Sequence, residues 1–204
     1  YNPYMSEGKK TVAFEVCEQL AWSAPDVIFV PVGDGCIIGG VHKGFKDLLA
    51  LGWIEKMPRI MGIQATGSSP LVDAWERGLE GWEMEPVEAH SVADSIVAGL
   101  PRDRIKALRA VRESGGSFLR VDDDAIVAAI PALAQGCGVF SEPAAAAAYA
   151  GLMQAMDRGL VSTEESVVVL ATGSGLKDIA TAMKSTGEPT IVEPDLADVR
   201  RAIG

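Results

Sequence analysis

The stretch from Val30 to Gly40, VPVGDGCIIGG, constrains the fold of this chain more than any other segment. An apolar run over residues 27–30 stops at a glycine-rich turn, and a helical pattern follows the turn. A strand, a glycine loop and a helix N-terminus in this order expose backbone N–H groups at the positive end of a helix dipole. The segment therefore predicts a phosphate-binding loop, although a strand-to-helix turn needs glycine even without a ligand.

Helical and strand patterns alternate along the rest of the chain. Apolar spacing predicts helices over residues 10–22, 37–51, 68–77, 104–113, 122–134 and 144–156, and strands over 27–32, 57–64, 117–121 and 166–171. The segment 80–101 has weak periodicity, with a short helix expected at 92–99. This alternation predicts an α/β fold with a doubly wound, mostly parallel sheet and helices on both faces.

A second glycine-rich turn follows the last predicted strand. The run SVVVLA over residues 166–171 is continuous and β-branched, which is typical of a central strand buried on both faces, and Thr172-Gly173-Ser174-Gly175 comes directly after it. In open α/β sheets, ligands bind beyond the carboxyl ends of the strands at a switch point. We therefore expect the amides of residues 33–38 to anchor a phosphate, and the hydroxyls of Thr172 and Ser174 to bond a ring heteroatom.

Composition limits the partners of such a site. The chain has 204 residues, a net charge of -10 and only two histidines, which argues against nucleic acid, anionic membranes and a zinc site. A small phosphorylated ligand fits this acidic background better than a polyanion. The three cysteines show no metal-binding spacing, and no signal peptide or run of membrane-spanning length is present, so we expect reduced thiols and a cytoplasmic location.

A dinucleotide-binding loop is the first alternative for the glycine turn. After Gly33 and Gly35, the GxGxxG pattern requires glycine where Ile38 stands, and Gly39 comes one residue late. The strand that follows ends in Gln64 and not in an acidic residue that could bind a ribose. Both departures argue against NAD as the cofactor.

Collinear segments along nearly the whole chain carry a resemblance to a known family. The chain resembles the pyridoxal-phosphate enzymes of fold type II, and within them threonine synthase and its relatives, in NPYMSEGKKTVAFEV (2–16), PVGDGCIIGGVHKGFKDL (31–48), IMGIQATGSSPLVDAW (60–75), HSVADSI (90–96), ALRAVRESGG (107–116), GVFSEPAAAAAYAGL (138–152) and VVVLATGSGLKD (167–178). The resemblance implies that this chain is the large cofactor-binding domain and that the cofactor is pyridoxal 5′-phosphate.

The resemblance also implies roles for particular residues. It implies that Thr172 bonds the pyridine nitrogen, that Glu142 lies near the cofactor ring, and that the phosphate loop is the backbone of Gly33, Asp34, Gly35, Cys36 and Ile37. A neutral hydroxyl at the ring nitrogen tempers the cofactor as an electron sink, which suits elimination and replacement at the β and γ positions better than transamination.

The chain departs from the family pattern in two places. The family's Schiff-base lysine precedes the NPY segment, and the match assigns Lys46 and Lys177 elsewhere, so we expect no catalytic residue in this chain. The chain then resembles the C-terminal part of an enzyme and is expected to be inactive by itself. Asp34 and Cys36 differ from the loop of threonine synthase, which leaves threonine or serine dehydratase, diaminopropionate ammonia-lyase and cysteate synthase as alternatives.

These observations predict a function and a domain organisation. We expect residues 1–10 to connect to a preceding part, residues 11–184 to form the cofactor-binding domain and residues 185–204 to form an extension. The intact protein is expected to be a dimeric biosynthetic lyase that acts on an O-phosphorylated or similarly activated amino acid. A non-catalytic module that binds a phosphate or a nucleotide is the alternative from another class.

The remaining polar residues have alternative roles. His42 is expected on the helix after the loop without a ligand role, whereas His90 lies in a segment that the resemblance puts near the active site. Ser91 and Asp94 either line the substrate cleft or cap the short helix beside them. Asp122 to Asp124 are expected to be a solvated helix start.

Overall fold

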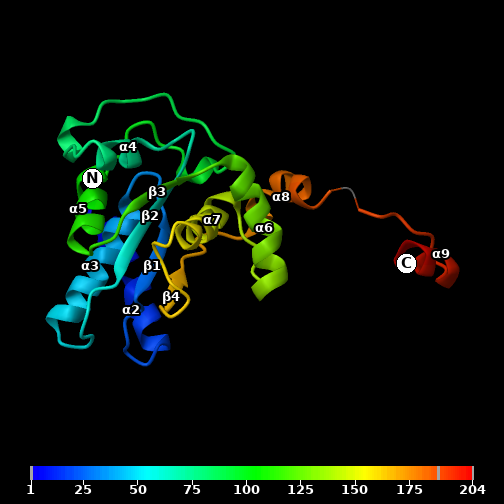
Figure 1. Cartoon of the computed structure of the whole chain (residues 1–204), viewed down its shortest axis with the longest axis horizontal. Coiled ribbons are helices and arrows are strands. Elements are labelled where there is room, and N and C mark those ends of the chain that lie inside the picture. Colours follow the sequence, from blue (N-terminus) through cyan, green and yellow to red (C-terminus); the bar gives the residue numbers. More distant parts are fainter. Residues whose placement is uncertain (1, 188, 204) are drawn as a thin grey trace.

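A four-stranded parallel sheet lies at the centre of the computed structural model, which describes residues 2–187 and 189–203 (Figure 1). The strands are β1 (Val27–Pro31), β2 (Arg59–Ala65), β3 (Phe118–Val121) and β4 (Val167–Val169), in the order β3-β2-β1-β4. Tyr1, Glu188 and Gly204 lie outside the described residues, so the two predicted terminal segments are each described only in part.

The order of the strands creates a switch point beside β1. The chain moves from β1 to β2 and β3 on one side, and then returns to the other side of β1 to form β4. In register, Val27 lies opposite Arg59 of β2 and opposite Val167 of β4. The carboxyl ends of β1 and β4 are therefore neighbours at the place where the winding direction reverses, as the sequence predicts.

Helices cover both faces of the sheet. Ile28 and Val30 belong to a core formed with α2 (Thr11–Gln19), α3 (Cys36–Ala50) and α5 (Arg104–Glu113). Val27 and Phe29 belong to a second core, formed with α6 (Asp123–Cys137) and the alanine-rich α7 (Pro143–Asp157). Because neighbouring strand residues point to opposite faces, β1 is buried on both sides. The predicted α/β, doubly wound class is thereby confirmed.

Four further helices complete the described chain. They are α1 (Pro3–Lys9), α4 (Pro70–Glu76), α8 (Ile179–Thr186) and α9 (Leu196–Ile203). The segment expected to be a connection thus contains a helix, α1, which packs against α3. α9 has no buried residue and lies apart from the sheet and its helices (Figure 1).

Two sequence predictions need correction. The short helix expected at 92–99 is wrong, because the segment contains only a 3-10 turn at Asp94–Ile96, after an earlier one at Gly81–Glu83. The prediction that 166–171 is a central strand is also wrong. Within the described chain β4 pairs only with β1, spans Val167–Val169 and is half-buried. A run of β-branched residues favours extended backbone, but it does not determine how many strands lie beside it.

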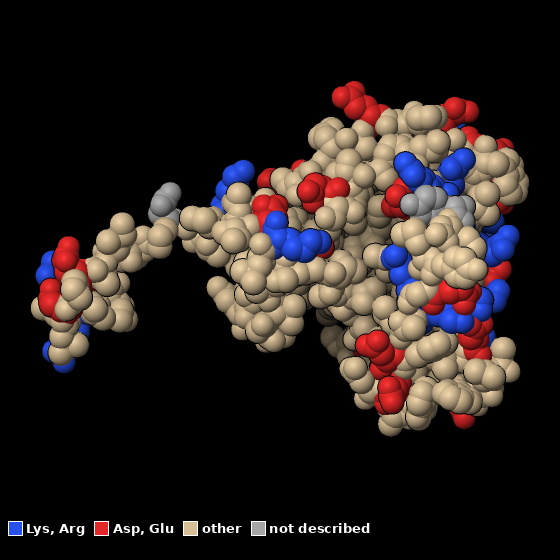
Figure 2. Space-filling model, turned by 180° about the vertical axis from the view of Figure 1, so that it is seen from behind, with Lys and Arg blue, Asp and Glu red and all other residues tan. Residues whose placement is uncertain are grey.

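Charge is mixed on the one face of the molecule that Figure 2 shows. On the face shown in Figure 2, basic side chains lie in small groups with acidic side chains beside them. Among the described residues, no helix combines the length and the apolar character needed to cross a bilayer. No group of three or more His, Cys, Asp and Glu side chains in the same residues has an arrangement suited to a metal ion.

Candidate functional site

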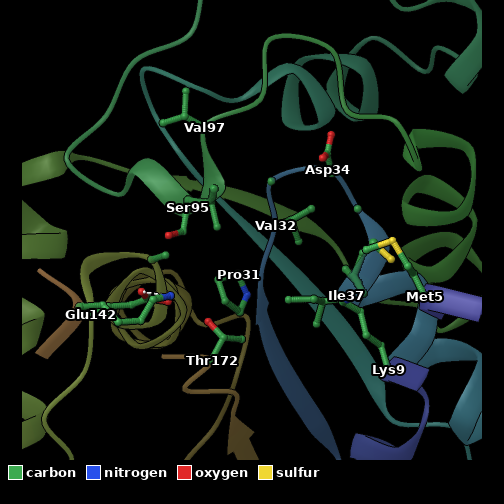
Figure 3. A pocket seen from close by; sticks show the side chains of 17 residues that line it. Met5, Lys9, Pro31, Val32, Asp34, Ile37, Ser95, Val97, Glu142 and Thr172 are labelled. Carbon is green, nitrogen blue, oxygen red and sulfur yellow. Dashed lines mark ion pairs between the residues drawn. The ribbon is translucent and has the colours of Figure 1, made fainter. Parts of the chain in front are cut away.

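A cavity of about 320 Å³ opens at the switch point, beyond the carboxyl ends of β1 and β4 (Figure 3). Its lining includes the residues to which the family resemblance gives a cofactor-binding role: Gly33, Asp34, Gly35, Cys36, Ile37, Glu142 and Thr172. These residues come from the loop after β1, from the start of α7 and from the turn after β4. The structure therefore brings these seven residues together around one cavity.

The loop after β1 presents unpaired amides to this cavity. Gly35 is the N-cap of α3, with φ of 87°, and no side chain caps the helix. The first N–H groups of any helix have no partner within the helix. Within the described chain, the N–H groups of Cys36, Ile37 and Ile38 make no other backbone hydrogen bond. Donors at the N-terminus of a 15-residue helix form a suitable site for an anion.

Tight packing behind the loop explains its glycines. A Cβ at Gly33 would lie 2.9 Å from the Ile96 Cα, and one at Gly35 would lie 2.9 Å from the Ala107 Cβ. Gly35 also has a positive φ, which side chains other than glycine adopt at a cost. The two glycines let the loop lie against the 94–96 turn and α5, so the conformation of the amides is fixed by packing.

Asp34 joins the loop to the segment just before α5. The Asp34 Oδ1 accepts a hydrogen bond of 3.1 Å from the Arg102 N–H, and its carbonyl accepts one of 2.8 Å from the Asp103 N–H. The carboxylate is therefore occupied in joining two loops. An anion in the cavity would use the backbone around Asp34 and not its side chain.

Cys36 is a buried residue in the first turn of α3. Burial raises the pKa of its thiol, while the positive charge of Lys9 acts in the opposite direction. The thiol is therefore protonated at neutral pH and behaves as a small apolar side chain. Its position supports a backbone role at the loop and gives no support to thiol chemistry.

Glu142 forms the opposite wall of the cavity and is only 5% exposed. Its Oε2 lies 2.7 Å from the Lys177 Nζ, and this hydrogen bond raises the pKa of Lys177. The Glu142 N–H donates to the Gly173 carbonyl at 3.0 Å, and a Cβ at Gly173 would overlap the Glu142 carboxylate. Glu142 therefore holds the turn after β4 against the start of α7.

The two hydroxyls predicted to bond a ring heteroatom, those of Thr172 and Ser174, have different surroundings. Thr172 is exposed on the cavity wall, and within the described residues its hydroxyl makes no hydrogen bond (Figure 3). The Ser174 Oγ accepts a hydrogen bond of 3.3 Å from the Leu176 N–H and lies outside the cavity lining. Only Thr172 therefore has a hydroxyl available to a ligand in the cavity.

Several other polar residues lie outside the site. His42 is buried, its Nε2 lies 3.4 Å from the Glu113 Oε2, and burial lowers the pKa of its ring. The Lys46 Nζ also pairs with the Glu113 Oε2, at 2.9 Å. His90 is exposed, and its N–H donates to the Gly67 carbonyl at 2.9 Å. None of these side chains lines the cavity.

The loop before the 94–96 turn is held in place by an aspartate of α6. The Ser91 hydroxyl donates to the Asp123 Oδ1 at 2.6 Å, and the Val92 N–H donates to the Asp123 Oδ2 at 3.1 Å. Asp123 is thus a structural acceptor and more than a solvated helix start, which corrects the expectation for Asp122 to Asp124. Neither Ser91 nor Asp94 lines the cavity.

Some lining residues were missed by sequence reasoning. They come from α1, from the turn at 94–96 and from the segment after β4: Met5, Lys9, Ser95, Ile96, Val97 and Lys177. The sequence holds no local signal for them, since their place in the cavity depends on packing between distant segments. The resemblance assigns Lys177 to the segment after the last glycine turn and not to the cofactor lysine, and the structure shows it paired with Glu142.

Comparison with known sequences gives a family match and similar relatives. The family model described as pyridoxal-phosphate dependent enzyme matches residues 1–173. The chain is 38% identical to the threonine synthase of Methanocaldococcus jannaschii and 41% identical to that of Methanosarcina acetivorans, in each case over 99% of this chain and 50% of the relative. It is 40% identical to the threonine synthase of Mycobacterium tuberculosis, over 100% of this chain and 54% of the relative. The chain thus spans about half the length of the curated relatives it matches.

Solved structures show the same fold at lower identity. A fungal L-serine ammonia-lyase from Rhizomucor miehei superposes with a TM-score of 0.74 at 22% identity, covering 90% of this chain and 56% of that protein. The processed form of threonine deaminase isoform 2 from Solanum lycopersicum gives 0.68 at 22% identity, covering 89% of this chain and 48% of that one. At these identities the likeness establishes the arrangement of the sheet and its helices.

Proposed function

Because this chain belongs to the pyridoxal-phosphate-dependent enzyme family, we propose that it is the C-terminal, cofactor-binding part of a threonine synthase-like lyase. The observation that carries the proposal is the cavity at the switch point, where unpaired amides of α3, Thr172 and Glu142 face one volume. The similarity to threonine synthases extends over 99% of this chain. The intact enzyme would act on a small, O-phosphorylated or similarly activated amino acid.

The residues of the cavity fit pyridoxal 5′-phosphate. Its phosphate would be held by the amides around Gly33, Gly35 and Ile37, which have no partner within the described residues. The Thr172 hydroxyl would meet the pyridine nitrogen. When bound, the cofactor supplies an electron sink for the bonds of the substrate's α-carbon.

We propose that the cavity residues of the described chain bind and orient the cofactor and do not transfer protons. Glu142 is tied to Lys177 and to the Gly173 backbone, so it fixes the wall beside the cofactor ring. Thr172 offers a neutral hydroxyl and not a carboxylate, which favours elimination or replacement over transamination. We propose that the lysine that carries the cofactor and moves protons belongs to a part of the enzyme that is not in this chain.

The proposal also covers the domain boundaries, the assembly and the location of the protein. The domain boundaries at residues 10 and 184 and the homodimeric state of the intact enzyme are proposals from the resemblance. A cytoplasmic location fits the cysteines Cys17, Cys36 and Cys137, all of which are free thiols.

Covalent labelling tests the assignment of the lysine. The chain is mixed with pyridoxal 5′-phosphate, reduced with borohydride and analysed by peptide mass spectrometry. Phosphate release from an O-phosphorylated amino acid is measured in parallel. We expect reversible binding, no stoichiometric labelling of a single lysine and no phosphate release. Full labelling of Lys46 that is abolished in Lys46→Arg, or of Lys177 that is abolished in Lys177→Arg, would contradict the proposal that the cofactor lysine lies outside this chain.

A further inference from the structure

Two aspartates, Asp34 and Asp103, lie at the phosphate loop proposed above. Asp34 lies within the loop, and Asp103, which is 3% exposed, donates its N–H to the Asp34 carbonyl. The Asp103 Oδ1 pairs with Lys106 at 3.0 Å, while its Oδ2 has no hydrogen-bond partner in the described residues. The chain as a whole carries a net charge of -10. Backbone dipoles alone would have to hold a doubly charged phosphate against this background.

Lys9 is positioned to supply a positive charge to a phosphate at this loop. It lies at the end of α1, lines the cavity and is drawn beside Ile37, below the loop, in Figure 3. The close crossing of α1 over α3 places it there, because a Cβ at Gly40 would lie only 2.7 Å from the Lys9 Cβ. Gly40 is one helical turn beyond Cys36, so the stem of Lys9 starts beside the first turn of α3.

The other lysines near the site are engaged elsewhere. Lys177 is paired with Glu142 across the cavity, at 2.7 Å. Lys10 follows Lys9 directly but lies outside the lining, and it pairs with Glu7 at 2.7 Å and Asp47 at 3.1 Å. Within residues 2–187 and 189–203, the Lys9 ammonium has no ion pair or hydrogen bond. Its charge nevertheless reaches the first turn of α3, where it opposes the effect of burial on the pKa of Cys36.

We propose that the Lys9 ammonium binds the phosphate group held by the amides of residues 33–38 and supplies the full positive charge that the loop lacks. This inference rests on the proposed function of the cavity. If so, α1 contributes a residue to the anion site, in addition to the loop after β1. The inference also predicts selectivity, since the ammonium would favour a doubly charged phosphate ester over the corresponding neutral alcohol.

A pair of non-reactive probes tests the inference. Pyridoxine 5′-phosphate and pyridoxine differ in the phosphate and lack the aldehyde that reacts with lysines. Their dissociation constants are measured by isothermal titration calorimetry at low and at high salt, for the 204-residue chain and for Lys9→Met, Lys9→Arg and Lys10→Met. Lys10→Met is the matched control, because it removes the neighbouring charge outside the cavity. Circular dichroism checks that each variant is folded.

The inference makes a distinct prediction for each variant. Lys9→Met weakens binding of pyridoxine 5′-phosphate by about tenfold at low salt and by less at high salt, because salt screens the lost charge. Lys9→Arg keeps most of the affinity, and Lys10→Met stays within about twofold of the starting chain. The affinity for pyridoxine changes little in any variant.

The outcomes separate this inference from the proposed function. Saturable binding by the unaltered chain with equal affinity in Lys9→Met, or equal losses in Lys9→Met and Lys10→Met, would overturn the role of Lys9 and leave the cavity's function standing. Absence of saturable binding by the folded, unaltered chain would overturn both.

Discussion

Position 35, in the loop after β1, must meet two structural requirements that favour glycine. Its φ of 87° lies in the left-handed region, and a side chain would meet the Ala107 Cβ at 2.9 Å and the Asp103 carbonyl oxygen at 3.1 Å. The first requirement costs about 1–2 kcal/mol for a residue other than glycine. The second would move the loop away from α5 and displace the amides that face the cavity.

Gly35→Val is therefore expected to weaken binding of pyridoxine 5′-phosphate at least about tenfold, because the donors lose their common orientation. Gly52→Val is the matched control, since Gly52 has φ of 72° but open space around its Cβ position. The control should lose stability through strain and keep its affinity. Unchanged affinity in folded Gly35→Val would show that the phosphate binds elsewhere.

Thr172 offers the cavity a hydroxyl, and its neighbour Ser174 provides a comparison. Thr172→Val should weaken pyridoxine 5′-phosphate binding by about 1 kcal/mol, or roughly fivefold, the contribution of one hydrogen bond. Ser174→Ala should change affinity little, because the Ser174 Oγ bonds the Leu176 N–H and not a ligand. Equal effects of the two substitutions would remove Thr172 from the site.

His42 makes the stability of the chain depend on pH. Burial lowers the pKa of its ring below the ordinary value of 6.5, so the unfolded chain binds this proton at a higher pH than the folded chain does. Stability is then fully present above about pH 6.5 and falls as the pH decreases toward the folded pKa, with a slope of at most about 1.4 kcal/mol per pH unit.

Urea unfolding between pH 7.5 and 5 measures this effect. His42→Leu should flatten the decline in this window, because the carboxylates with lowered pKa values titrate at lower pH. A slope that is the same in His42→Leu as in the unaltered chain would contradict the assignment.

At the scale of elements, the crossing of α1 and α2 over α3 is set by glycines. A Cβ at Gly44 would overlap the Lys10 carbonyl oxygen and lie 2.7 Å from the Ala13 Cβ. By contrast, Gly136 in α6 has nothing within 4 Å of its Cβ position. Substitutions at these two positions therefore distinguish the effect of helix propensity on stability from the effect of close packing between helices.

Gly44→Ala should destabilise the chain by about 2 kcal/mol or more, because the helices must move apart. Gly136→Ala should be neutral or should stabilise it by up to about 1 kcal/mol, since alanine is the better helix former. Thermal unfolding of both variants makes the comparison. A stabilised Gly44→Ala variant would show that α2 and α3 are not in close contact at this position.

The elements also show what the sequence can predict. α3, α4, α5 and α7 lie within one or two residues of their predicted bounds, because apolar spacing and Pro or Gly at their ends agree. α1 and the edge position of β4 could not be predicted in this way. Both depend on which distant segment lies beside them, and local spacing carries no information about that.

At the scale of the whole molecule, the site depends on bringing residues 33–37, 142 and 172 to one edge of the sheet. The strand order β3-β2-β1-β4 does this by placing β4 beside β1. The two glycine turns could be predicted to meet, because a parallel sheet aligns the carboxyl ends of its strands. Lys9 and the turn at 94–96 could not, because they enter the cavity from segments outside the sheet.

The central claim is that the ends of β1 and β4 together hold a phosphorylated pyridine. Its most direct test is a titration of the ¹⁵N-labelled chain with pyridoxine 5′-phosphate, followed by amide NMR. The account predicts saturable shifts concentrated at residues 33–38 and 172–173, with little change at Lys46, His90 or α9. Saturation with shifts confined to other residues, or no saturable shift at all in the folded chain, would contradict it.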